Sequence, residues 1–220
     1  MKKKTLTIAI ALVLVVALAV GATWAYLTAT AGPVTNTFTA GKAVAQGDLK
    51  LYEHLAKQNT DGTYSLDKKA NTVTSNTYTV MPGVNLPKDP TVEVTKAEGP
   101  YYLFVEVTKG DGFTGEKAPL SCTVDGSHWV ALNIEGREVY AYKTADGTDP
   151  AILSKELAAT PVLATIGNTD NTITVADDNA KISELTEANS ALTFKAYACQ
   201  AAGFADATEA FTTCFGTANP

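Results

Sequence analysis

Short runs of β-branched and aromatic residues, separated by Asp-Gly dipeptides, constrain the fold of this chain more than any other feature. These dipeptides begin at Asp61, Asp111, Asp125 and Asp146, and each favours a tight turn. The runs between them lack the strand–helix alternation of a parallel nucleotide-binding sheet. The spacing predicts an all-β domain of short strands, arranged as a sandwich or barrel.

The clearest strand is expected at 101–108. One face carries only apolar or aromatic residues, Tyr101, Leu103, Val105 and Val107, and should point into the core. A second strong strand is expected at 191–200, with apolar residues at every second position from Leu192 to Ala198. Further strands are expected at 91–95, 129–133, 137–143 and 172–175.

Helical signals are few. Asp149 and Pro150 precede a stretch, 151–157, that has the N-cap and first-position residues of a short helix. A second short helix is expected at 206–215, where Asp206 can cap an alanine-rich amphipathic segment. The polar stretch 59–76 and the glycine-rich stretch 110–119 are expected to be surface loops.

The first 25 residues have the three parts of a secretory signal peptide. Three lysines at positions 2–4 precede an apolar stretch at 6–20, and small residues surround a tryptophan at 21–25. The apolar stretch is shorter than the roughly 20 residues that a membrane span needs. We therefore expect cleavage between Ala25 and Tyr26, and an uncleaved membrane anchor is the alternative.

Charge and cysteine content limit the function classes. Loss of the three N-terminal lysines changes the formal charge from −6 to −9, and such a chain repels nucleic acid and anionic membranes. The three cysteines, Cys122, Cys199 and Cys214, permit at most one internal disulfide and one free thiol. Cys199 and Cys214 are closest in sequence and are the candidate pair. The alternative is that they are small buried residues.

A search for catalytic motifs gives no site. His54 and His128 are the two histidines, and neither belongs to an H-E-x-x-H zinc motif. We expect His54 to be solvated and His128 to lie in a turn. A thiol nucleophile formed by Cys122 and His128 is the weaker interpretation, because such a pair must meet in space. We expect no catalytic residues, metal site or cofactor.

Three blocks of sequence resemble a known family. They are the stretch 21–28 with 31–41, the stretch 81–94 followed by 102–105, and the stretch 194–200 with Gly203-Phe204. Together they are similar to the TasA and camelysin family of exported proteins from Gram-positive bacteria, whose signal peptides are removed by the peptidase SipW. The resemblance covers most of the chain.

The resemblance implies an antiparallel jelly-roll β-sandwich at 42–220, preceded by the signal peptide at 1–25. It also implies that the segment 26–41 is a donor strand that completes the sheet of the next subunit. Its apolar anchors would be Leu27, Val34 and Phe38. The alternative is that residues 35–40 form the first strand of their own sheet.

The leading functional hypothesis is a secreted structural protein, a subunit of fibres in the extracellular biofilm matrix or on the cell surface. Its partners would be other copies of itself and other matrix or cell-surface proteins, with membrane contact only through an uncleaved signal peptide. The alternatives are a secreted metal-dependent protease, as camelysin-like relatives imply, and an adhesin that uses exposed Trp129, Tyr140 or Tyr142.

Overall fold

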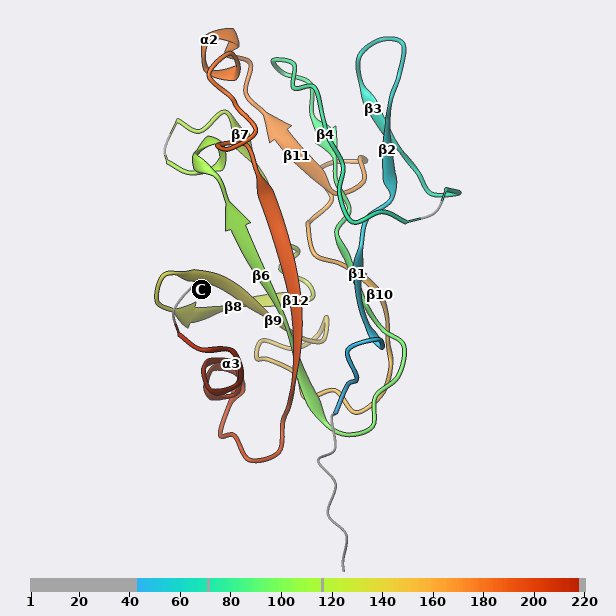
Figure 1. Ribbon diagram of the computed structural model, residues 1–220, viewed down its shortest axis with the longest axis vertical. Coiled ribbons are helices and arrows are strands. Elements are labelled where there is room, and N and C mark those ends of the chain that lie inside the picture. The colour runs from blue at the N-terminus through green and yellow to red at the C-terminus, as the bar shows by residue number, and fades with distance from the viewer. Residues whose placement is uncertain (1–42, 71, 116, 218–220) are drawn as a thin grey trace, which may run out of the picture. The chain divides into compact units, whose positions relative to one another are not determined.

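The computed structural model describes residues 43–70, 72–115 and 117–217 of the 220-residue chain. The expected signal peptide (1–25), the cleavage site between Ala25 and Tyr26, and the expected donor segment (26–41) with Leu27, Val34 and Phe38 lie outside the described residues. The regular elements of the described part are mostly β-strands, and its sheets are antiparallel, so the predicted all-β class is confirmed (Figure 1).

Two antiparallel sheets pack face to face as a β-sandwich. The first has the order β1-β5-β10, and the second has the order β12-β6-β9-β8. Their strands are β1 (Leu49–Tyr52), β5 (Thr91–Val94), β10 (Leu157–Pro161), β6 (Tyr101–Lys109), β8 (Trp129–Ile134), β9 (Arg137–Tyr142) and β12 (Leu192–Gln200). Val92 and Val94 of the first sheet share one apolar core with Leu103, Val105 and Trp129 of the second.

Short strands extend this sandwich at one end. They are β2 (Leu55–Gln58), β3 (Tyr64–Asp67), β4 (Leu86–Pro87), β7 (Leu120–Ser121) and β11 (Thr172–Val175). Strands β4, β11 and β7 pair around a small core of Leu86, Leu120, Ile173 and Val175. The expectation of a loop throughout 59–76 is wrong, because β3 pairs with β2 as a hairpin. One solvated face lets such a hairpin carry many polar residues.

The helices are α2 (Asn179–Ile182), α3 (Ala207–Phe215) and the 3₁₀ turn η1 (Asp111–Phe113). Helix α3 confirms the expected helix, and Asp206 caps it by accepting a bond from the backbone N–H of Glu209 at 2.8 Å. The expected helix after Pro150 is wrong. Leu153 instead pairs with Tyr101 by two backbone hydrogen bonds of 2.8 and 2.9 Å, so tertiary pairing outweighs the local helix signal. No helix among the described residues is long and apolar enough to cross a membrane.

Strand β6 is buried on both faces. The face with Leu103, Val105 and Val107 points into the sandwich core, as predicted. The opposite face is covered by α3, where the rings of Phe104 and Phe211 lie 5.2 Å apart between centroids. The central position of β6 explains why its sequence is apolar on nearly every residue.

Candidate functional site: a groove along the free edge of β12

Among the described residues, one edge of strand β12 is unpaired. Strand β6 is its neighbour on one side, and no other described strand pairs with it. Gly110 N donates to Ala191 O at 2.8 Å. Because hydrogen-bonded and non-hydrogen-bonded pairs alternate in an antiparallel ladder, the backbone groups of Leu192, Phe194 and Ala196 point away from β6. Such an edge is a template for an additional strand.

A groove lies between this edge and the edge of the other sheet. Strand β1 is an edge strand of its own sheet and lies beside β12 (Figure 1). Two hollows of about 350 and 310 Å³ adjoin each other there and share Asn76, Lys88, Leu192 and Thr193. We call them together the β12 groove. Its other walls include Leu51, Tyr52, Glu53, Tyr78, Val80, Leu86, Phe113, Ile173 and Phe194.

A further hollow lies at the opposite end of β12. It measures about 290 Å³ and is lined by Ala43, Val44, Ala198, Gln200 and Phe215, together with Cys199 and Cys214. The described chain begins here, and Ala43 is fixed by a hydrogen bond from Glu98 N to its carbonyl oxygen at 2.8 Å. Ala43, the first described residue, therefore lies beside the C-terminal end of β12.

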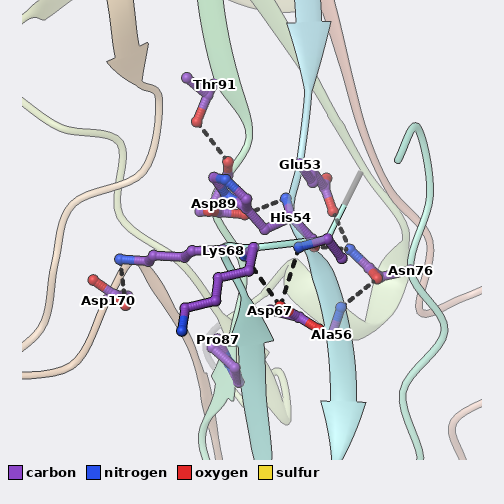
Figure 2. A network of polar contacts seen from close by, with 12 residues as sticks. Glu53, His54, Ala56, Asp67, Lys68, Asn76, Pro87, Asp89, Thr91 and Asp170 are labelled. Carbon is purple, nitrogen blue, oxygen red and sulfur yellow. Dashed lines mark hydrogen bonds and ion pairs between the residues drawn. The ribbon is translucent and has the colours of Figure 1, made fainter. Parts of the chain in front are cut away.

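Three polar side chains from distant parts of the chain meet in the wall of the groove. Glu53 follows β1, Asn76 lies in the connection between β3 and β4, and Lys88 follows β4. Lys88 Nζ lies 2.6 Å from Glu53 Oε1, and Asn76 Nδ2 donates to Glu53 Oε2 at 3.0 Å. Figure 2 shows Glu53 and Asn76 in this arrangement. We call these residues the Glu53–Lys88–Asn76 cluster.

The cluster is nearly closed to water. The side chains of Lys88 and Glu53 are 8% and 9% exposed, and Lys88 Nζ lies 5.8 Å from the ring centroid of Phe194. Asn76 Oδ1 accepts a hydrogen bond from Ala56 N at 2.8 Å. The sequence signal for this cluster is small, a Lys-Asp dipeptide between Pro87 and Pro90, and sequence analysis missed it.

His54 lies beside the cluster and is half-buried, so the expectation that it is solvated is wrong. Its Nδ1 lies 2.6 Å from Asp89 Oδ2, and its backbone N–H donates to Asp89 Oδ1 at 3.0 Å (Figure 2). The peptide carbonyl of Asp89 accepts a bond from the Thr91 hydroxyl at 2.8 Å. One carboxylate therefore holds the turn after β1 against the segment before β5.

Tyr78 forms part of the groove wall next to this cluster. Its hydroxyl donates to the carbonyl oxygen of Pro87 at 2.6 Å. Burial raises the pKa of Tyr78 most, and the negative charges of Glu53 and Asp89 raise it further. Tyr78 is therefore a neutral hydrogen-bond donor that fixes β4 beside the groove.

The remaining candidate residues lie elsewhere. Cys199 and Cys214 form a disulfide, with their Cα atoms 6.7 Å apart, that ties α3 to β12. Cys122 is free and half-buried, and burial is the main cause that raises the pKa of its thiol. His128 pairs with Asp125, its Nδ1 lying 2.7 Å from Oδ2, as suits a turn residue.

The aromatic residues named for an adhesin do not form an exposed cluster. Trp129 is 2% exposed and donates its indole N–H to Pro161 O at 2.7 Å. Tyr140 and Tyr142 are half-buried against the sandwich core. Trp129 is therefore covered, and Tyr140 and Tyr142 expose only part of their surface.

The site combines an apolar groove beside a strand edge with one buried amine, one carboxylate and one amide in its wall. Among residues 43–70, 72–115 and 117–217, no group of three or more His, Cys, Asp or Glu side chains is placed to hold a metal ion. No protein-family model, curated protein or solved structure matches the chain.

Proposed function

We propose that this protein is a secreted structural subunit of fibres in an extracellular matrix or on a cell surface. In this proposal the segment 26–41 of one copy inserts into the β12 groove of the next copy. The free edge of β12 beside the groove carries the proposal. The resemblance of the sequence to the TasA and camelysin family supports the same function.

The donor segment suits such a groove in its side chains and its backbone. Val34 and Phe38 are four residues apart, so in an extended strand they lie on one face about 13 Å apart. The groove offers Leu51, Leu192 and Phe194 as apolar walls. Backbone hydrogen bonds to the free edge of β12 would supply affinity, and the apolar anchors would supply register.

The point of attachment favours donation to a neighbour. Ala43 lies at the C-terminal end of β12, so a segment that turned back along its own groove would run parallel to β12. Parallel pairing is slightly less stable per residue than antiparallel pairing. A segment from a neighbouring copy can enter antiparallel, and repetition of this head-to-tail contact gives a filament.

The first test compares two forms of the protein, one beginning at Tyr26 and one beginning at Lys42. Size-exclusion chromatography and negative-stain microscopy should show filaments for the longer form and a folded monomer for the shorter form. Two equally monomeric forms across a range of pH and salt would contradict the proposal.

A second test separates the donor from the acceptor. A synthetic peptide of residues 26–41 should bind the form that begins at Lys42 and raise its melting temperature, because a ligand that binds only the folded state stabilises it. The matched control is the same peptide with Phe38→Asp, which would bury a charge in an apolar groove. Equal binding by the two peptides would rule out Phe38 as an anchor.

A further inference from the structure

The Glu53–Lys88–Asn76 cluster places an amine and a carboxamide on the two oxygens of one carboxylate. We propose that Lys88 and Asn76 become joined by an isopeptide bond between Nζ and Cγ, formed by the protein itself with Glu53 as the catalytic proton carrier. This inference does not depend on fibre assembly. It rests on the positions, burial and chemistry of these three residues.

The geometry places both reacting groups on the same carboxylate and holds them there. Lys88 Nζ is 2.6 Å from Glu53 Oε1, and Asn76 Nδ2 is 3.0 Å from Glu53 Oε2. Asn76 Nδ2 also donates to His54 O at 2.9 Å, which fixes the plane of the amide. Holding two reactants in place removes much of the entropic cost of their reaction.

The carbonyl that would be attacked is already polarised. Asn76 Oδ1 accepts a hydrogen bond from the backbone N–H of Ala56 at 2.8 Å. When an amine adds to Cγ, negative charge develops on Oδ1, and a fixed backbone donor at that position stabilises it. The N–H of Ala56 therefore acts as a one-donor oxyanion hole.

The amine and the carboxylate are both shielded from water. Only 8% of the Lys88 side chain and 9% of the Glu53 side chain are exposed, and Phe194 lies against the amine. A buried ion pair carries a large desolvation cost. In the proposed reaction, one proton passes from Nζ to Oε1 along their 2.6 Å contact and leaves a neutral amine, which is the nucleophilic form.

The reaction balances without a further reagent. Nζ forms a bond to Cγ, and the bond from Cγ to Nδ2 breaks. Of the protons on the Lys88 ammonium group, one stays on the new amide nitrogen. Glu53 passes the others to Nδ2, which keeps its own protons and leaves as ammonium. No electron transfer occurs, and the carboxylate of Glu53 is regenerated.

Other lysines of the described residues lack this combination. Lys57 and Lys96 also pair with carboxylates, but their side chains are 57% and 60% exposed. The carboxylate beside Lys109 binds the hydroxyl of Tyr140 in place of an amide. Water and the absence of an acyl group keep these amines unreactive, so the inference is specific to Lys88.

The bond would brace one wall of the β12 groove. It would close the chain between residues 76 and 88, which includes the residues that line the 310 Å³ hollow from Thr77 to Leu86. This connection has little regular structure of its own. A covalent closure restricts it in the unfolded state and holds it in place in the folded state.

Cyanogen bromide cleavage tests the inference directly. The chain has two methionines, Met1 and Met81, and Met81 lies between Asn76 and Lys88. Cleavage after Met81 should leave the two pieces of the wild-type protein joined on a reducing, denaturing gel. Intact mass should be lower than the sequence mass by one ammonia molecule. Wild-type pieces that separate would overturn the proposal.

Variants assign the roles. Lys88→Arg keeps a cation without a nucleophilic amine, and its pieces should separate. Asn76→Asp should still form the link by losing water, giving a product with the same mass as the wild-type product. Lys109→Ala, at the half-exposed pair, is the matched control and should stay joined. Glu53→Ala should abolish the link, and a linked Glu53→Ala protein would overturn the role of Glu53.

Discussion

Two buried acid–base pairs lie on opposite faces of the sheet that contains β6 and β12, and they differ in chemistry. Under α3, Arg137 binds Glu106 through Nε and Nη2 at 2.8 and 2.9 Å. Arg137 Nη1 also donates to the carbonyl oxygens of Phe215 and Gly216 at 3.3 and 2.9 Å. In the β12 groove, Lys88 binds Glu53 with an amide beside it and hollows on both sides.

The two pairs differ in their cation, and the cation decides whether a buried pair can only hold the structure or can also react. A guanidinium stays protonated, and its fork of donors can satisfy a carboxylate and a helix end together. An ammonium on a flexible stem can lose a proton and become a nucleophile. The α3 side therefore holds a helix in place, whereas our two proposals assign to the groove side a reactive lysine and an incoming strand.

The largest expected effect is on the α3 side. Arg137→Met should lower the free energy of unfolding by about 3–5 kcal/mol, because it leaves the carboxylate of Glu106 buried without its partner. The end of α3 also loses the donor that binds its last carbonyl groups. Urea unfolding, followed by circular dichroism, measures the change.

The control for this substitution is an exposed pair. Lys57→Met breaks an ion pair with Asp67 in which the lysine side chain is 57% exposed, and it should cost less than about 1 kcal/mol. Replacing both Arg137 and Glu106 by apolar residues should recover part of the loss, since no charge is then left unpaired. Equal effects of Arg137→Met and Lys57→Met would contradict the structural role.

The next largest effects are the losses of stability expected when the disulfide or the proposed isopeptide link is removed. The disulfide between Cys199 and Cys214 closes a loop with a sequence separation of 15, which predicts a loss of about 3 kcal/mol on its removal. The proposed link between Asn76 and Lys88 closes a loop of similar length, so Lys88→Arg should also cost about 3 kcal/mol.

Reduction distinguishes these links. Dithiothreitol should destabilise the wild-type protein through the disulfide and leave the wild-type cyanogen bromide pieces joined. In the Lys88→Arg protein the two losses should add, because the sites are independent. A wild-type protein whose stability is unchanged by reduction would show that the disulfide does not hold α3.

Low pH should reduce the stability that the Arg137–Glu106 pair under α3 contributes. Hydrogen bonds from Arg137, and then from Tyr197, hold the pKa of Glu106 below its usual value. The unfolded-state value is about 4.3. The stability contributed by this group is therefore complete above that pH and is lost as pH falls through the lower folded-state pKa.

The measurement is the free energy of unfolding of wild-type protein and Glu106→Gln between pH 7 and pH 3. The difference in the free energy of unfolding between wild-type protein and Glu106→Gln should be constant near neutral pH. It should become smaller below about pH 4.3. A difference that widens in acid would contradict the depressed pKa of Glu106.

Local patterns predicted much of the fold but little of the site. Strands β5, β6, β8, β9, β11 and β12 were predicted to within one or two residues, because alternation and β-branched composition reflect burial directly. The expected helix after Pro150 failed because pairing of Leu153 with Tyr101 is a long-range contact. Glu53, Asn76 and Lys88 could not be grouped from sequence, since only the packing of separate segments brings them together.

The smallest expected effect tests which end of α3 holds the helix. Asp206→Ala removes the side-chain oxygen that accepts a bond from Glu209 N at 2.8 Å, and loss of such a cap costs about 1 kcal/mol. Asp206→Asn retains an acceptor, so it should change the free energy of unfolding by only a few tenths of about 1 kcal/mol. The C-terminal half of α3 stays fixed by the disulfide at Cys214 and by Arg137, so hydrogen exchange should accelerate only in the first turn. If Asp206→Ala destabilises the protein as much as Arg137→Met, then the N-terminal cap holds α3 on the sheet. The Arg137–Glu106 pair would then not have the structural role that distinguishes it from the Lys88–Glu53 pair.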